Sequence, residues 1–257
     1  MVRKSLLDVT GRHIAALETV LDQARCRPGE ELHGRVLVTA GQEPVAADGV
    51  RMALVACVAV IDGGGEYGTG QEFHRTQVAG ATRLDPGQRR ELPFRYPVPW
   101  QSPLTRLYDQ PLVGLSVGLH TELAVDWAPD PGELDPVQVA PTPAQEQILA
   151  ALARLGFRPV GAQIQRGHLY GVGQQVPFHQ VLEFAAPPGW AGRLDRFELV
   201  FLADERQSQV LLEVDKPGGF LGLGRTAYER LTVANDDAGE TDCADRIEAW
   251  LRRAVPA

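Results

Sequence analysis

A proline-rich stretch followed by a capped helix divides this chain into two runs of strand-like sequence. Five prolines lie between residues 128 and 143. Thr142 is an N-cap residue, proline occupies the first helical position, and Gln145 can reach back to complete a capping box. An apolar stripe then repeats at helical spacing until Gly156 ends the helix: Ile148, Leu149, Leu152 and Leu155. We therefore predict a domain over residues 1–140, a linker helix over 141–156 and a second domain over 157–257.

The first run contains short strands separated by turns. Apolar residues alternate over 32–38, behind a turn at 27–30, and residues 52–61 are apolar on both faces. Residues 92–98 also alternate, but the prolines among them remove hydrogen-bond donors, which restricts this segment to an edge strand or an extended crossing. The glycine-rich residues 63–70 are predicted to form a flexible hairpin tip.

The second run repeats this pattern. Segments 178–184, 195–202 and 209–214 alternate at least in part, and Asp242 is an N-cap for a terminal helix over 243–254. Strands at regular spacing with Gly/Pro turns indicate β-sandwiches rather than a parallel α/β sheet. Residues 14–24 fit either a helix face or a strand face, and their pattern alone favours a helix.

The charge and the cysteine content of the chain indicate which partners it can bind and in which cellular compartment it works. The formal net charge is −8 and both halves are mildly acidic, which disfavours nucleic acid as a partner. The longest apolar run, 52–61, is shorter than the roughly 20 residues that span a bilayer, and no signal peptide is expected. Three cysteines without short spacing, Cys26, Cys57 and Cys243, indicate neither a disulfide framework nor a zinc site. We expect a cytoplasmic protein.

Two alternative chemistries are left open by short patterns. Residues 114–118 match the nucleophile-elbow motif around Ser116, which would make the chain a serine hydrolase using His120 or His168. The strand alternation continues through this motif, however, and provides no helix to follow the serine. A loop containing Asp126, Asp130 and Asp135 could bind calcium or a small ligand, although its spacing does not fit an EF-hand.

An ordered set of segments resembles the bacterial sporulation-control protein family, which is similar to arrestins, over about residues 12–235. The segments are 27–36, 92–97, 100–105 (Trp-Gln-Ser-Pro-Leu-Thr), 120–131, 139–141, 155–157, 194–195, 200–201, 211–215 and 218–221. One departure is Ser102, where the family commonly has threonine, and another is Trp127, where a small residue is more usual. Residues 236–257 lie beyond the resemblance.

The resemblance implies a mainly β fold of two tandem arrestin-like β-sandwich domains with a short linker helix, and it places a first strand at residues 14–24. It also implies a regulatory adaptor for developmental control that binds other proteins, with no enzymatic activity, no cofactor and no metal. Self-association is left open. The motif residues are expected to serve turns, strand ends and interdomain packing: Trp100, Pro103, Leu104, Thr105, Asp126, Pro131, Phe157 and Asp215.

Overall fold

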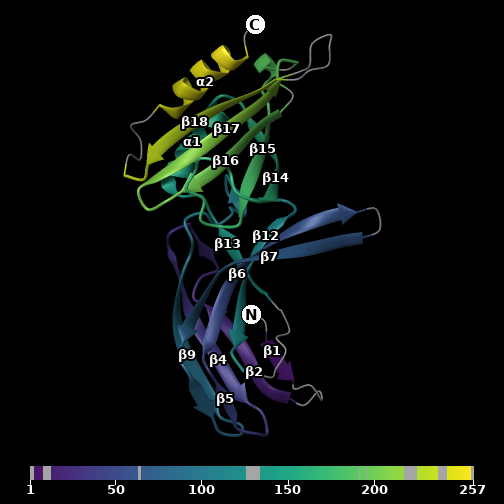
Figure 1. Ribbon diagram of the computed structural model, residues 1–257, viewed down its shortest axis with the longest axis vertical. Coiled ribbons are helices and arrows are strands. Elements are labelled where there is room, and N and C mark those ends of the chain that lie inside the picture. Colours follow the sequence, from purple (N-terminus) through teal and green to yellow (C-terminus); the bar gives the residue numbers. More distant parts are fainter. Residues whose placement is uncertain are drawn as a thin grey trace. The chain divides into compact units, whose positions relative to one another are not determined.

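A computed structural model describes residues 3–7, 13–62, 65–125, 134–190, 192–194, 196–216, 225–236 and 242–255 (Figure 1). The chain divides into two compact units. The first consists of Met1–Pro99 with Ser116–Val139, and the second of Trp100–Leu115 with Ala140–Ala257. A segment from the middle of the first unit's sequence therefore belongs to the fold of the second unit.

The first unit contains two main sheets. One has the order β1-β2-β4-β9, with strands β1 (Arg3–Leu7), β2 (His13–Leu21), β4 (Glu31–Ala40) and β9 (Arg89–Pro97). The other has the order β3-β13-β12-β6-β7, with strands β3 (Arg25–Cys26), β13 (Leu134–Val139), β12 (Leu115–Leu123), β6 (Val50–Asp62) and β7 (Gly65–Ala79). A short ribbon pairs β5 (Val45–Ala47) with β8 (Thr82–Leu84).

The two ambiguous segments of the first unit are both strands. The helix that the local pattern favours at residues 14–24 is wrong, because β2 pairs with β4 from Ala15 opposite Ala40 to Leu21 opposite Gly34. This pairing buries Leu17 at the inner face of the sheet. Strand β9 pairs with β4 alone and lies at the edge of its sheet, which confirms the interpretation of its prolines.

The glycine-rich segment at 63–70 is mostly strand rather than loop. β7 begins at Gly65, which pairs with Asp62 of β6, so the predicted flexible tip is wrong for residues 65–70. Glycine is a poor strand residue in isolation. Here the apolar partner strand supplies the pairing that local sequence does not indicate.

The second unit is one five-stranded antiparallel sheet with helices on one face. Its order is β14-β15-β16-β17-β18: β14 (Arg158–Arg166), β15 (Phe178–Ala185), β16 (Arg196–Ala203), β17 (Gln207–Lys216) and β18 (Arg225–Ala234). The helices are α1 (Pro143–Arg154) and α2 (Cys243–Ala254), and a single 3-10 turn, η1 (Pro188–Trp190), precedes β16. The inserted segment adds a two-stranded ribbon of β10 (Arg106–Leu107) and β11 (Gln110–Pro111).

The two-domain arrangement expected from the sequence agrees with these two units. In the described residues the layer opposite the sheet is helical, and α1 is part of it. Phe157 and Phe197 contact each other with tilted rings whose centroids are 4.5 Å apart, and Trp250 of α2 meets Phe197 edge-on at 6.4 Å. Both predicted helix caps are confirmed, since Thr142 and Gln145 form the capping box and Asp242 caps α2. Mainly β architecture is likewise confirmed.

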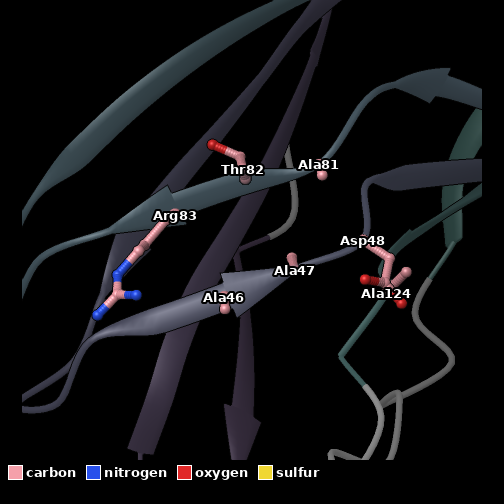
Figure 2. A pocket seen from close by; sticks show the side chains of 7 residues that line it. All are labelled: Ala46, Ala47, Asp48, Ala81, Thr82, Arg83 and Ala124. Atoms are coloured by element: carbon pink, nitrogen blue, oxygen red, sulfur yellow. The ribbon is translucent and has the colours of Figure 1, made fainter.

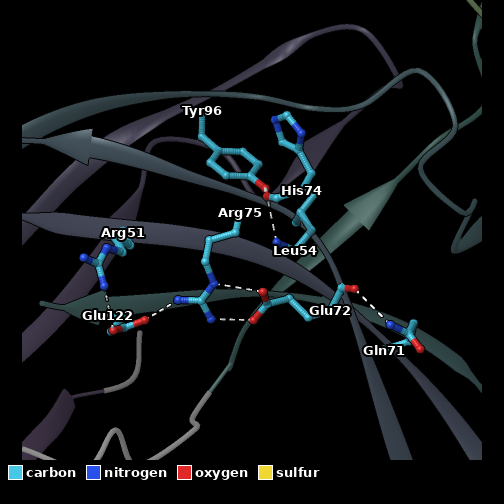
Figure 3. Close-up of polar contacts among 8 residues, drawn as sticks. All are labelled: Arg51, Leu54, Gln71, Glu72, His74, Arg75, Tyr96 and Glu122. Carbon is cyan, nitrogen blue, oxygen red and sulfur yellow. Dashed lines mark hydrogen bonds and ion pairs between the residues drawn. The ribbon is translucent and has the colours of Figure 1, made fainter. Parts of the chain in front are cut away.

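A buried tyrosine joins the two sheets of the first unit. Tyr96 of β9 is fully buried, and its hydroxyl accepts a hydrogen bond from the Leu54 amide at 3.1 Å while donating to the His74 carbonyl (Figure 3). The β6–β7 register passes from Ala53 opposite Arg75 to Leu54 opposite Phe73, so His74 is the extra residue of a β-bulge, with φ of +54°. Tyr96 thus satisfies backbone groups that the bulge removes from the ladder.

Removing this hydroxyl should destabilise the first unit. In Tyr96→Phe the buried Leu54 amide and the partly buried His74 carbonyl lose their partner, which we expect to cost about 1–3 kcal/mol of unfolding free energy. Chemical denaturation measures this. Tyr228→Phe is the matched control, because Tyr228 is 69% exposed and its change should stay within about 0.5 kcal/mol. Equal effects of the two substitutions would contradict the role of Tyr96.

Candidate functional site

The outer part of the β6–β7 hairpin is an arm with two unpaired edges. Arg51 bonds Glu122 at 3.6 Å and the Cys57 side chain bonds Ser116, so β12 begins beside residue 58 of β6. Beyond that point β6 and β7 continue to pair with each other, from Val58 opposite Thr69 to Asp62 opposite Gly65. We call residues 58–69 the hairpin arm. In the described part of the chain β7 is the last strand of its sheet, and β12, the neighbour of β6 on the other side, begins at Leu115, so the arm extends past the start of β12. Figure 1 shows the two strands running on past their neighbours.

A charged network holds three strands together at the base of the arm. Arg75 of β7 makes a double hydrogen bond to Glu72, with Nε to Oε1 at 2.8 Å, and also pairs with Glu122 of β12 (Figure 3). Glu122 in turn contacts Arg51 of β6. The hydrogen bond from Arg75 lowers the pKa of Glu72, so this carboxylate is charged at neutral pH. These side chains are partly exposed, so the network contributes orientation more than stability.

The second site is a segment of the second unit clamped by two glutamines. The Gln180 amide of β15 accepts from the Leu104 amide and donates to the Leu104 carbonyl, both at 2.8 Å. The Gln101 amide accepts from the Gln175 backbone at 2.7 Å and donates to the Gly173 carbonyl at 2.8 Å. Each side chain supplies one donor and one acceptor, as a neighbouring strand would. We call residues 100–105 the clamped segment.

Four of the residues expected from the family motif lie in the clamped segment. Pro103, Leu104 and Thr105 are buried, and Trp100 is half-buried. Trp100, Pro103 and Leu104 line, together with β15 and Gln145 of α1, a small cavity in the second unit. The sequence indicated this segment, Gln101 included, but not its contacts, since nothing local marks Gln180 or the backbone at 173–175 as its partners.

The turn after the clamped segment is strained. Tyr108 and Asp109 have φ of +49° and +59°, in the left-handed region that a two-residue β10–β11 hairpin requires. A bulky residue is rare there. The Tyr108 hydroxyl donates to the Leu149 carbonyl of α1 at 2.7 Å, and burial raises the pKa of this hydroxyl to about 12. This bond holds the turn against the helix.

The remaining motif residues are dispersed. Phe157 is buried beneath the helices of the second unit. Asp215 lies near the end of β17, where it accepts from Thr226 at 2.8 Å and faces Arg196 at 3.4 Å. Asp126 and Pro131 lie outside the described residues. Their expected roles at turns and in interdomain packing stay predictions.

Ser116 and His120 of the hydrolase pattern do not form a nucleophile–base pair. Ser116 lies within β12, and its side chain bonds Cys57. His120 is four residues further along the same strand, roughly 13 Å away at strand spacing. A nucleophile and its base must be within hydrogen-bond reach of each other. His168 belongs to the second unit. Ser116 therefore lies within a strand and not at a turn between a strand and a helix.

The calcium pattern has one described member. Asp135 is buried in β13, whereas Asp126 and Asp130 lie outside the described residues. Within the described ranges, no group of three or more His, Cys, Asp or Glu side chains could hold a metal ion. Cys26, Cys57 and Cys243 form no disulfide, and burial raises the pKa of the Cys26 thiol to about 12.

A hollow in the first unit carries no catalytic pattern. It has a volume of about 520 Å³ and lies between β5, β8 and the end of β12 (Figure 2). Its lining contains four alanines, Asp48, Thr82 and Arg83. In Figure 2 the Arg83 side chain lies well apart from Asp48. The hollow therefore presents small apolar side chains and no nucleophile–base pair.

These observations define a mainly β protein of two units that carries a projecting hairpin arm and a clamped segment. A family model described as SpoOM protein matches residues 3–218, and the chain belongs to this family. The sporulation-control protein spo0M of Bacillus subtilis (strain 168) is 28% identical over 258 residues, covering 98% of this chain and 96% of that protein. The resemblance found in the sequence is confirmed.

The fold of the chain is similar to that of a solved relative. The crystal structure of Spo0M from Bacillus subtilis superposes with a TM-score of 0.74 at 23% identity, covering 93% of this chain and 98% of that one. Among the described residues, no helix combines the length and the apolar character that crossing a membrane requires.

The contact of Gln180 with the clamped segment can be tested by replacing its amide nitrogen with oxygen. In Gln180→Glu a carboxylate oxygen replaces the amide donor and faces the Leu104 carbonyl. We expect a loss of about 1–2 kcal/mol of unfolding free energy at pH 7.5, because a half-buried charge then faces the carbonyl without a donor. The folded state favours the protonated carboxyl, which can donate. Its pKa is therefore raised above about 4.3, and the loss should shrink as the pH falls towards 4.5.

Chemical denaturation across this pH range measures the effect. Gln165→Glu is the control, because Gln165 lies on β14 with its side chain exposed. A Gln180→Glu loss that does not depend on pH, or that equals the control, would contradict the donor role of the amide.

His74, the extra residue of the β-bulge in β7, should make the stability of the first unit depend on pH. Burial lowers the pKa of His74 below its ordinary value of 6.5, so the unfolded chain binds a proton at higher pH than the folded one. Stability is therefore lost as the pH falls below 6.5. His74→Asn keeps a residue that tolerates positive φ but does not titrate. Thermal unfolding at pH 7.5 and 5.5 should show a smaller drop for the variant than for the wild type, and equal drops would refute this.

Proposed function

We propose that this protein is a non-catalytic regulator in the cytoplasm that acts by binding other proteins, and that the hairpin arm is its docking element. The relationship to a sporulation-control protein supports a role in sporulation or a related developmental process of its host. The observation that carries the docking proposal is the pair of unpaired strand edges on residues 58–69.

Two other edge strands, β9 and β14, are protected against strand addition, whereas the edge strand β18 contains no proline. β9 carries Pro93 and Pro97, and β14 carries Pro159 beside a bulge at Val160. Prolines and bulges are the usual means of preventing edge-to-edge pairing. The arm has neither, since its ten paired residues contain no proline and run in regular register. An exposed regular edge can accept an extended segment of a partner through backbone hydrogen bonds.

Pairing with a third strand would stabilise the hairpin arm. An isolated two-stranded ribbon is marginally stable in water, whereas three strands are stable. Val58, Val60 and Ile61 are strong strand formers on β6. We therefore propose an extended strand of a partner protein as the occupant of the arm's edge.

Shortening the arm tests this function. Residues 58–69 are replaced by Asn-Gly, which closes a two-residue hairpin between Cys57 and Gly70, a pair that faces each other in the native register. The variant should keep the thermal stability of the wild type because the sandwich strands are intact. It should lose the proteins that the tagged wild type captures from its host's lysate and should fail to restore the developmental phenotype of a deletion strain.

Ser116→Ala is the control that separates this proposal from a hydrolase. It should capture the same proteins as the wild type and restore the phenotype, and a fluorophosphonate probe should label neither protein. A shortened-arm variant that still captures those proteins and restores the phenotype would refute the docking role. Labelling that depends on Ser116 would refute the non-catalytic role.

A further inference from the structure

A small cavity lies between the clamped segment and β15 in the second unit. Its volume is about 20 Å³. The clamped segment, the strand β15 and Gln145 of α1 contribute to its lining, and most of the remaining lining is apolar, including Val176, Phe178 and Leu202. The cavity is therefore separate from the hollow of the first unit and from the hairpin arm.

Two buried polar atoms in this lining have no hydrogen-bond partner among the described residues. They are Ser102 Oγ, on a residue that is 5% exposed, and His179 Nδ1. The neighbouring amide of Gln180 binds the Leu104 backbone through both of its polar atoms and does not pair with either of them. Buried polar groups in folded proteins are nearly always paired, with protein or with ordered water.

The tautomer of His179 follows from its second contact. The ring hydrogen-bonds the Gly167 backbone, and the unpartnered nitrogen is Nδ1, so Nε2 carries the proton that is donated. Burial lowers the pKa of His179, which keeps the ring neutral at pH 7. Nδ1 is then an acceptor that requires a donor. Ser102 can both donate and accept.

We propose that one ordered water molecule occupies this cavity, donating to His179 Nδ1 and exchanging a hydrogen bond with Ser102 Oγ. A cavity must offer at least about 10–15 Å³ to hold a water, and the water needs two to four polar partners. The cavity meets both conditions, since its volume suits a single water and it offers two polar atoms. The water is a third tie between the clamped segment and β15, beside the two hydrogen bonds of Gln180.

A high-resolution crystal structure of the full chain tests the proposal directly. We expect a density peak within hydrogen-bond distance of both Ser102 Oγ and His179 Nδ1. In solution, ¹⁵N chemical shifts should report the Nε2-protonated tautomer of His179. Oxygen-17 relaxation dispersion counts water molecules that stay bound for long times, and Ser102→Val, which removes the hydroxyl and fills the cavity with methyl groups, should lower that count by one.

Ser5→Ala is the control. Ser5 is an exposed serine of β1 and is not part of this cavity's lining. Its substitution should leave the count of long-lived waters unchanged. A cavity without density, or a Ser102 hydroxyl bonded directly to His179, would overturn the proposal. If Ser102→Val does not fold, the wild-type density and the tautomer still decide.

Discussion

The hydrogen bonds of one buried phenol determine how the first unit is built around its longest hairpin. Tyr96 reaches from β9 of one sheet to the β6–β7 ladder of the other, at the point where His74 interrupts the register. A bulge bends its strand and increases the local twist. The direction in which the hairpin leaves the sandwich therefore depends on a bulge whose freed backbone groups need the Tyr96 hydroxyl. The charged network of Arg75 then fixes the three strands below the arm.

In the second unit, glutamine side chains hydrogen-bond the backbone of irregular segments, as a neighbouring strand does in a sheet. The clamped segment and the loop at 167–177 have no regular strand pairing, yet much of their backbone is close to the core. Gln174 accepts from the Leu169 amide and donates to the Gly167 and Val176 carbonyls. Gln101 and Gln180 repeat this pattern on the clamped segment. Because buried backbone groups require partners, amide side chains are suitable substitutes for a missing strand.

The Tyr96 hydroxyl and the glutamine amides explain how a mainly β protein can contain a bulge and an irregular segment while its sheets stay intact. The arm extends a regular ladder beyond its supporting layer, whereas the clamped segment brings an irregular stretch into a regular core. Both lie where the chemistry needed for catalysis does not converge in the described residues: Ser116 has Cys57 as its neighbour, and the hollow beside β5 is lined chiefly by alanine. At the hairpin arm, the groups available for contact are backbone donors and acceptors of the strand edges rather than reactive side chains.

The sequence by itself determined the elements whose signals are local. The capping box at Thr142, the N-cap at Asp242 and the edge position of β9 each depend on residues within a few positions of one another. Contacts between distant residues decided the rest: strand pairing overrode the helical pattern of β2, Tyr96 finds Leu54 across 42 positions, and Gln180 finds Leu104 across 76. Local patterns record which groups need partners, but only the folded chain shows which groups meet that need.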